Sequence, residues 1–310
     1  MYSPFENQLK ELVAGITANH DRFRFNISWD SGALPNRNKI IGIIGAFREL
    51  LFPDYFGKQD LTRNTMEYYI GNLTHNIFED LHQQVVHALK HQAIKDNEPL
   101  TDFQERAASI CCEFLGKVPA VMEILATDVQ AAFDGDPAAE DKDEIIFSYP
   151  GVFALFVYRL AHELYLLKVP LIPRIMTEYA HSRTGIDIHA GATIGRYFFM
   201  DHGTGIVIGE TSEIGDYVTI YQGVTIGALS TRGGQLLRGV KRHPTIEDRV
   251  TIYSGASILG GETVIGHDVV IGSNVFITES IPAGTTISLK NQELLYKDRS
   301  HQDLHQNFED

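Results

Sequence analysis

The sequence predicts an α+β protein in which an N-terminal all-helical domain is followed by a left-handed parallel β-helix built from hexapeptide repeats. Up to about residue 180, apolar residues recur at three- and four-residue spacing, which is typical of amphipathic helices. From residue 186 aliphatic residues recur every six residues, a period that neither a helix nor an ordinary strand produces. We therefore expect a helical domain over 1–182, a β-helix over 183–285 and a C-terminal tail over 286–310.

Helices are expected where the apolar period is three to four residues. The predicted stretches are about 40–51, 65–95, 101–115, 118–133 and 152–167. Pro53 follows the first stretch, and Asp134-Gly135-Asp136-Pro137 interrupts the chain before the last, because glycine and proline resist helix continuation. Glu105 stands where a capping arrangement begun by residues 101–102 would place it.

The six-residue repeat predicts short strands joined by tight corners. Each aliphatic residue points into the coil, and the small residue that often follows it fits a corner where positive φ is cheap for glycine. Three hexads, or about 18 residues, form one triangular coil. The in-phase positions are Ile188, Ile194 and Met200; Ile208, Ile214, Ile220 and Ile226; Ile246, Ile252 and Ile258; and Ile265, Ile271 and Ile277.

Breaks in this phase mark the places where the chain leaves the regular coil. Extra residues lie around 201–205 and at Gly260-Gly261, and 20 residues separate Ile226 from Ile246. The long gap predicts a protruding loop over 228–245. Insertions in a solenoid map to loops on one face, often the binding face.

Composition excludes some classes of protein. The chain has 26 basic and 40 acidic residues and a formal charge of −14, which argues against nucleic-acid binding. The N-terminus lacks a basic segment followed by an apolar one, and no apolar run reaches the ~20 residues that span a bilayer. The adjacent Cys111 and Cys112 do not suggest a disulfide framework. We expect a cytoplasmic protein without a membrane partner.

Several motifs resemble those of one enzyme family. Residues 187–189, 194–196 and 200–210 (Met-Asp-His-Gly-Thr-Gly-Ile-Val-Ile-Gly-Glu), with Arg242-His243-Pro244, resemble the signature of the serine O-acetyltransferases. Residues 128–138 resemble the segment before that family's β-helix, and 47–57 resembles its longer N-terminal form. The resemblance implies acetyl transfer from acetyl-CoA to the hydroxyl of L-serine, giving O-acetylserine and CoA in the first step of cysteine biosynthesis from serine.

The implied reaction needs a base, because an unactivated alcohol is a weak nucleophile toward a thioester. His202, in a polar segment at the first phase break, is the candidate. Its imidazole needs an acceptor that fixes the tautomer, a role that the resemblance gives to Asp187. Asp187 lies 15 residues earlier, close to one coil, so we expect it to stack near His202 on the adjacent turn.

Serine carries both signs of charge, so its site should too. The resemblance places Asp136 and Asp201 on the ammonium group and Arg242 and His243 on the carboxylate, for which the planar fork of arginine is suited. It places small residues in a groove for CoA: Ala228, Ser254 and Ser273. Basic residues near these segments could meet the anionic CoA: Arg196, Arg232, Lys241 and Arg242.

The resemblance also implies partners. Family members pack three β-helices side by side with shared active sites, so we expect a homotrimer, or a hexamer formed by two trimers, with His202 and His243 from facing subunits. L-Cysteine is the expected feedback inhibitor, and no metal is expected. Relatives that dock into O-acetylserine sulfhydrylase end in isoleucine, whereas this chain ends at Asp310, which argues against docking by that route. Val270 stands where relatives often carry a lysine that could serve the CoA phosphates.

Three other readings stay open from the sequence. The chain could be another hexapeptide acyltransferase that acts on homoserine, a sugar or a xenobiotic. It could be a γ-type carbonic anhydrase that binds zinc through histidines, although a closely spaced histidine pair is lacking; the candidates are His189, His202, His243 and His267. It could be a non-enzymatic scaffold, which leaves the Asp-His-Gly-Thr-Gly motif unexplained. His82, His87 and His91 are interpreted as a solvated helix face.

Overall fold

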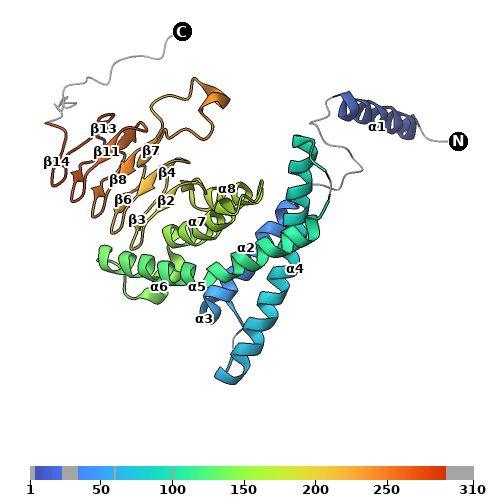
Figure 1. The fold of residues 1–310 in the computed structure, drawn as a ribbon, viewed down its shortest axis with the longest axis horizontal. Coiled ribbons are helices and arrows are strands. Elements are labelled where there is room, and N and C mark those ends of the chain that lie inside the picture. The colour runs from blue at the N-terminus through green and yellow to red at the C-terminus, as the bar shows by residue number, and fades with distance from the viewer. Residues whose placement is uncertain (1–3, 23–33, 59–60, 100, 291–310) are drawn as a thin grey trace, which may run out of the picture.

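A computed structural model describes residues 4–22, 34–58, 61–99 and 101–290. Eight helices precede the strands in these ranges (Figure 1): α1 Pro4–Arg22, α2 Arg37–Leu51, α3 Pro53–Phe56, α4 Arg63–Asp96, α5 Phe103–Gly135, α6 Lys142–Ser148, α7 Pro150–Leu166 and α8 Ile172–Thr184. α8 extends past residue 182, where the sequence placed the boundary. Most of the predicted tail, including the terminal Asp310, lies outside the described residues.

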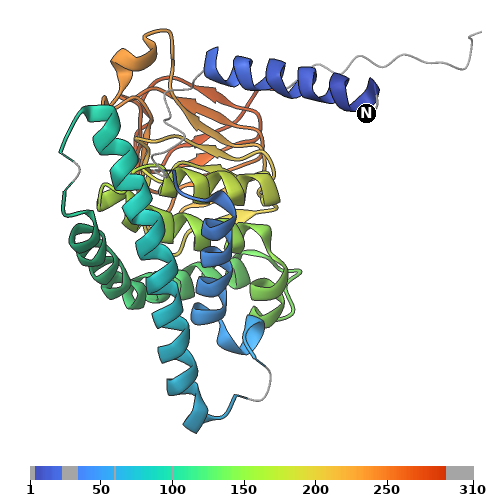
Figure 2. The same ribbon diagram turned by 90° about the vertical axis from the view of Figure 1, so that its right-hand side faces the viewer.

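Each of the five stretches predicted from the apolar periodicity is helical, whereas α1, α3, α6 and α8 were not among them. The stretches predicted over 101–115 and 118–133 are one helix, α5, which continues through Pro119. Buried residues on both sides of the proline, Phe114 and Val121 among them, keep one face of α5 in the core and offset the lost hydrogen bond. The predicted capping arrangement is wrong, since Asp102 has φ 59° and its side chain caps nothing. α2 and α4 pack side by side (Figure 2).

The second half is a parallel β-helix, as the six-residue period predicts. Its strands are β1 Asp187–Ile188, β2 Thr193–Ile194, β3 Phe199–Asp201, β4 Val207–Ile208, β5 Glu213–Ile214, β6 Thr219–Tyr221, β7 Thr225–Gly227, β8 Thr245–Ile246, β9 Thr251–Ile252, β10 Ser257–Leu259, β11 Val264–Ile265, β12 Val270–Ile271, β13 Phe276–Ile277 and β14 Thr286–Ile287. The in-phase aliphatic side chains stack inside the coil and are buried. The fold class predicted from the sequence is confirmed.

Three sheets form the faces of the β-helix. The first sheet has the order β1-β4-β7-β10-β13, the second β11-β8-β5-β2 and the third β14-β12-β9-β6-β3. The chain visits the first, second and third sheets in turn and then returns to the first. Between β7 and β8 it leaves the coil as a long loop that contains a short 3-10 turn, η1 Gly234–Leu237.

The helical half and the β-helix share one hydrophobic core. A single cluster of buried side chains extends from Ile40 in α2 to Ile277 in β13, and α5, α7 and α8 contact the first coil. At this junction Arg159 of α7 and Asp128 of α5 form a buried ion pair, with Nε 2.6 Å from Oδ2. Arg159 also donates to the carbonyl of Gly195 at 2.7 Å, and Asp128 accepts from the N–H of Phe198 at 3.1 Å. The pair therefore fixes both helices to the coil.

Two further sequence expectations concern membranes and thiols. Within the described residues no single helix is long and apolar enough to cross a membrane, although the bent pair α6 and α7 meets that test together by length and composition. Cys111 and Cys112 are both free. Cys111 is buried, and burial raises the pKa of its thiol to about 12.

Candidate active site on the edges of the beta-helix

The predicted site residues of the β-helix lie at the corners between sheets or at strand ends next to them. We call the corner where the chain passes from the third sheet to the first the third–first edge, and the corner from the first sheet to the second the first–second edge. His202 follows β3 and precedes β4, so it lies on the third–first edge. His243 precedes β8 of the second sheet and lies on the first–second edge. The first sheet separates these two edges within one chain.

The third–first edge carries the predicted base and both predicted ammonium ligands. The His202 side chain is 74% exposed, and its Nδ1 lies 3.7 Å from Oδ1 of Asp201. Asp136, the residue that ends α5, is close enough for His202 to influence its pKa. The Tyr149 hydroxyl donates to Asp136 Oδ2 at 2.6 Å, and the N–H of Ala138 donates to Oδ1 at 2.8 Å. The fold thus brings Asp136, Asp201 and His202 together.

Hydrogen bonding keeps Asp136 anionic. The Tyr149 hydroxyl is the main cause that lowers the pKa of Asp136, followed by the N–H of Ala138, and His202 adds to the effect. Burial and the bond to Asp136 raise the pKa of Tyr149, which therefore remains a donor. Tyr149 was missed from the sequence, because it lies outside every recognised motif and 13 residues from its partner.

The same edge continues down the β-helix past two of the three residues predicted for CoA. Ser254 and Ser273 follow β9 and β12 of the third sheet, and their hydroxyl groups are 3.2 Å apart. The corner that holds them repeats a left-handed backbone at Gly205, Gly223, Gly255 and Asn274. On this corner the exposed Gln222 lies between the coil of His202 and Ser254, so the two serines are two and three coils further along than His202.

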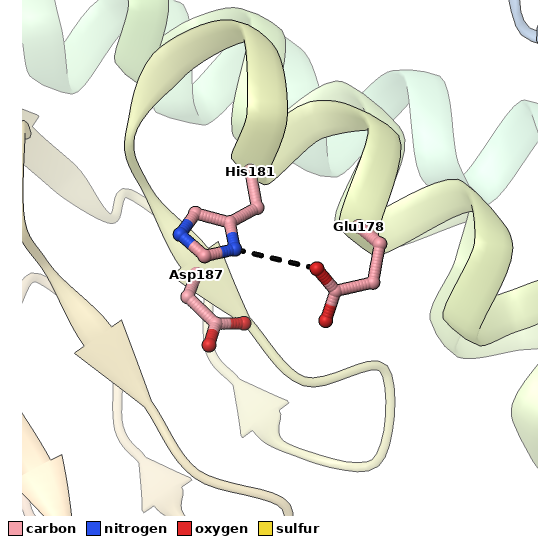
Figure 3. A group of neighbouring side chains, drawn as sticks. All are labelled: Glu178, His181 and Asp187. Carbon is pink, nitrogen blue, oxygen red and sulfur yellow. Dashed lines mark hydrogen bonds and ion pairs between the residues drawn. The ribbon is translucent and has the colours of Figure 1, made fainter.

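Asp187 lies on this edge but does not contact His202. Its strand partner is Val207, so the first coil takes 20 residues to close and His202 belongs to the same coil rather than the adjacent one. Asp187 faces α8 instead (Figure 3), where its carboxylate lies within 4.8 Å of the ligand atoms of Glu178 and His181. Within the described part of the chain the Asp187 carboxylate has no hydrogen bond or ion pair.

The first–second edge carries the predicted carboxylate ligands. Arg242, at the end of the long loop, forms an ion pair with Glu210, which also accepts from the Tyr165 hydroxyl at 3.1 Å. Burial alone would raise the pKa of Glu210, but the hydrogen bond from Arg242, His189 and the Tyr165 hydroxyl hold it below its usual value. Glu210 ends the recognised motif. Its pairing with Arg242 could not be predicted, because the path of the long loop that precedes Arg242 does not follow from the sequence.

His243 packs against this edge beside Arg242. It is 7% exposed, and its Nδ1 accepts from the N–H of Thr211 at 3.0 Å. A Cβ on Gly209 would overlap the imidazole ring, so this position has to be glycine. Ala228, the third residue predicted for CoA, begins the long loop directly after β7 and lies on this edge.

Replacing Gly209 with alanine is expected to displace the side chain of His243 and, with it, Arg242. The added methyl group would occupy the space of the imidazole, and moving the ring breaks its bond to Thr211. We expect catalytic efficiency to fall about tenfold or more, since overpacking typically costs 1–3 kcal/mol. Steady-state kinetics measure this, with Gly71→Ala on the exposed face of α4, where a Cβ meets nothing within 4 Å and φ is negative, as the control for a glycine substitution. Unchanged kinetics for Gly209→Ala would contradict the assignment.

The basic residues expected near CoA are dispersed. Lys241 donates to the carbonyl of Thr211 at 2.7 Å and pairs with Glu213 at 3.3 Å, and Arg232 is exposed in the long loop. Arg196 follows β2 and lies at the corner between the second and third sheets, away from both other edges. Arg196 therefore lies apart from Arg232, Lys241 and Arg242, which belong to the long loop.

The histidines weighed for zinc are dispersed as well. His189 and His243 lie on the first–second edge, His202 on the third–first edge and His267 between the second and third sheets. One chain therefore brings no three of them together. Among the described residues, the group Glu178, His181 and Asp187 gathers potential metal ligands, but Glu178 is already paired with Arg174 at 2.5 Å and with His181 at 3.4 Å. On α4, His82 is bonded to the carbonyl of Gln104 and Nδ1 of His87 is buried, so this face is not simply solvated as interpreted.

A parallel β-helix of hexapeptide repeats, with a histidine and carboxylates on one edge and an arginine and a histidine on another, defines the class of hexapeptide acyltransferases. A serine acetyltransferase from a plasmid of Synechococcus elongatus is 46% identical over 261 residues, covering 82% of each chain. The Bacillus subtilis serine acetyltransferase is 48% identical over 125 residues, which are 40% of this chain and 55% of the relative. No family model matches the sequence.

Solved structures give the same result. Serine acetyltransferase 1 of Entamoeba histolytica, crystallised in complex with L-cysteine, superposes with a TM-score of 0.69 at 38% identity over 79% of this chain and 86% of its own. Isoform 3 from the same organism, also in complex with cysteine, gives 0.67 at 35% identity over 83% of this chain and 84% of its own. The chain belongs to the serine acetyltransferase family, and it is an acyltransferase.

Proposed function

We propose that the protein transfers the acetyl group of acetyl-CoA to the hydroxyl of L-serine, giving O-acetylserine and CoA, in the first step of cysteine biosynthesis. One observation carries the proposal: the fold gathers two carboxylates beside His202 on one edge and places Arg242 with His243 on another. An amino acid presents an ammonium and a carboxylate group together, and the two edges carry the complementary charges. A neutral sugar would use neither.

The reaction follows from these positions. His202 takes the proton of the serine hydroxyl as the oxygen attacks the thioester carbonyl. The tetrahedral oxyanion collapses, the C–S bond breaks, and the sulfur of CoA leaves with the proton returned from the imidazole. Asp136 and Asp201 hold the substrate ammonium and Arg242 its carboxylate. We assign Asp187 to orienting His202, because it opens the same coil on the same edge and its carboxylate has no hydrogen bond or ion pair within the described residues.

The binding site for acetyl-CoA is proposed along the same edge. Ser254 and Ser273 lie on the same edge as His202, two and three coils further along, and their small side chains allow a thioester chain to approach the backbone closely. Ala228 starts the long loop on the other edge and would meet the ligand from a second subunit. No metal is needed in this scheme, because His202 supplies the base.

Because the first sheet separates the two edges, one chain holds only half of each site. We propose a homotrimer, alone or paired into a hexamer, in which the third–first edge of one subunit meets the first–second edge of the next. A head-to-tail contact of this kind closes into a ring when the rotation allows it. His202 and His243 then face each other across a subunit boundary.

Mixed oligomers test the shared site. His202→Ala and Arg242→Ala should each be inactive alone, but refolding them together should restore about a quarter of the wild-type sites, because an intact site needs His202 from one subunit and Arg242 from its neighbour. Turnover per subunit, measured after mixing and compared with each variant refolded alone, gives the result. A mixture as inactive as its components would mean that each chain builds its own site.

The substrate is tested by thiol release from acetyl-CoA. L-Serine should support turnover, whereas homoserine and a sugar acceptor should not, and L-cysteine should compete with serine, since the Entamoeba histolytica relatives were crystallised with it. Turnover with homoserine or a sugar but not serine would replace the proposed substrate with that acceptor. Absence of turnover with every acceptor would overturn the proposal. We place the reaction in the cytoplasm. The expectation about docking through the C-terminal residues concerns residues 291–310, which lie outside the described ranges.

A further inference from the structure

His243 is a buried imidazole with one nitrogen satisfied and the other free. Its side chain is among the few buried polar groups of the β-helix, at 7% exposure. Nδ1 lies 3.0 Å from the backbone nitrogen of Thr211 and 2.8 Å from its Oγ1. Nε2 has no hydrogen-bond partner within the described residues. Nε2 is not among the enclosed polar atoms that lack a partner in the described residues, so it reaches the surface and is open to a ligand.

The partners of Thr211 determine where the imidazole proton sits. A backbone N–H can only donate, so Nδ1 must accept from Thr211 and cannot carry the proton. The Thr211 hydroxyl already accepts from the backbone N–H groups of Arg242, at 2.9 Å, and His243, at 3.1 Å. Both of its lone pairs are then used, and its own proton points to Nδ1. The neutral imidazole therefore carries its proton on Nε2.

Burial and the neighbouring positive charges keep this imidazole neutral. Burial is the main cause that lowers the pKa of His243 to about 4, and Arg242 adds to it. Glu210 acts in the opposite direction, while His189 and Lys241 lower the pKa further. Near neutral pH the Nε2–H group is thus a donor without a positive charge. It cannot serve as a base, because its free nitrogen already holds a proton.

We propose that Thr211 is a positioning residue that fixes His243 as the Nε2–H tautomer, so that His243 meets the substrate carboxylate, the group that the family resemblance assigns to it, as a neutral N–H donor. The inference rests on the proposed function, because it assumes that Arg242 beside His243 receives the substrate carboxylate. The Arg242 guanidinium donates one N–H to Glu210 and another to the carbonyl of Leu237. Its remaining N–H groups can bind the substrate. His243 supplies a second, uncharged contact that fixes the carboxylate's orientation.

Nitrogen NMR of the full-length protein tests the tautomer of His243 independently of enzyme activity. With 15N-labelled histidine, the signals of His243 are assigned by their loss in His243→Asn. We expect the Nε2 signal at the chemical shift of a protonated ring nitrogen and the Nδ1 signal at the shift of an unprotonated one. Couplings to the ring protons distinguish the two nitrogens. Both shifts should stay constant from pH 8 down to pH 5.5. A protonated Nδ1, or a ring that titrates above pH 6, would overturn the proposal.

Kinetics test the role of Thr211. Thr211→Val keeps the shape and the backbone N–H but removes the hydroxyl that holds Arg242 and His243, so the KM for serine should rise about five- to tenfold with kcat nearly unchanged. The KM for acetyl-CoA should stay constant. Thr211→Ser retains the hydroxyl and should restore the KM for serine. Thr193→Val, an exposed threonine of β2 without a side-chain hydrogen bond, is the matched control.

The outcomes separate the inference from the proposed function. A fall in kcat with an unchanged KM for serine, or no change in either constant, would overturn the role assigned to Thr211. If Thr211→Val does not fold, the kinetics of Thr211→Ser and the NMR spectra of the wild type still test the role of Thr211. If the wild type shows the expected tautomer but never acetylates serine, the proposed function fails while the Thr211–His243 arrangement stands.

Discussion

Replacing Asp128 with alanine is expected to lower the free energy of unfolding by about 3–5 kcal/mol, because the guanidinium of Arg159 is left charged and buried without its carboxylate. The side chains of Arg159 and Asp128 are 5% and 0% exposed, so water cannot replace the lost partner. Asp128 also accepts the N–H of Phe198, which would be orphaned as well. Denaturant unfolding followed by circular dichroism at fixed protein concentration measures the change.

Two controls separate the buried charge from a general effect of substitution. Asp80→Ala breaks an exposed pair with Lys39, with 3.5 Å between Nζ and Oδ1, and should cost less than about 1 kcal/mol. The double variant Asp128→Ala with Arg159→Met removes both charges and should recover most of the lost stability, because buried pairs are often no better than apolar residues of similar size. A loss for Asp128→Ala as small as that of Asp80→Ala would contradict the argument.

The same pair links the helical half to the site. Asp136 ends the helix that Asp128 anchors, two turns further along α5. Gly195 and Phe198, the coil residues that the pair contacts, flank the corner that leads into β3 and then to His202. A helix that lost this anchor would shift Asp136 relative to Asp201. We therefore regard α5 as the element that brings a substrate ligand from the helical half to the edge of the β-helix.

The sequence was most informative where a period or a motif repeats a physical constraint. In a triangular coil, an aliphatic residue at every sixth position can be buried only in the interior. The three faces, the buried interior and the corners could therefore be predicted from spacing alone. The phase breaks likewise marked His202 and the loop before Arg242 as positions outside the regular coil. The resemblance then supplied roles, which stay predictions, and the fold brings Asp136 and Asp201 near His202.

What could not be predicted depends on contacts between distant segments. The Tyr149 hydroxyl meets Asp136 because α6 turns back on α5, and nothing local in the sequence signals that turn. Thr211 meets His243 only because a loop of unpredictable path returns to the corner it left. The helix through Pro119 shows the opposite case, in which burial on both sides outweighs a local rule. Packing decided each of these outcomes.

Replacing His202 with alanine is expected to lower kcat about 100- to 10,000-fold, since general base catalysis contributes on that scale. The KM for serine should change little, because Asp136, Asp201 and Arg242 would still hold the two charged ends of the substrate. Thiol release from acetyl-CoA at saturating serine measures the loss. His267→Ala, an exposed histidine on a different corner of the β-helix, is the matched control and should keep kcat within about twofold.

This variant should affect rate without affecting stability, the reverse of Asp128→Ala. The His202 side chain is 74% exposed and has one weak contact, 3.7 Å from Asp201, so its removal leaves no cavity and no orphaned group. The unfolding midpoint should match that of the wild type. A kcat within threefold of the wild type would mean that another group takes the serine proton. An unfolding midpoint lowered as far as that of Asp128→Ala would mean that His202 supports the fold, and the loss of rate could then not be assigned to its imidazole.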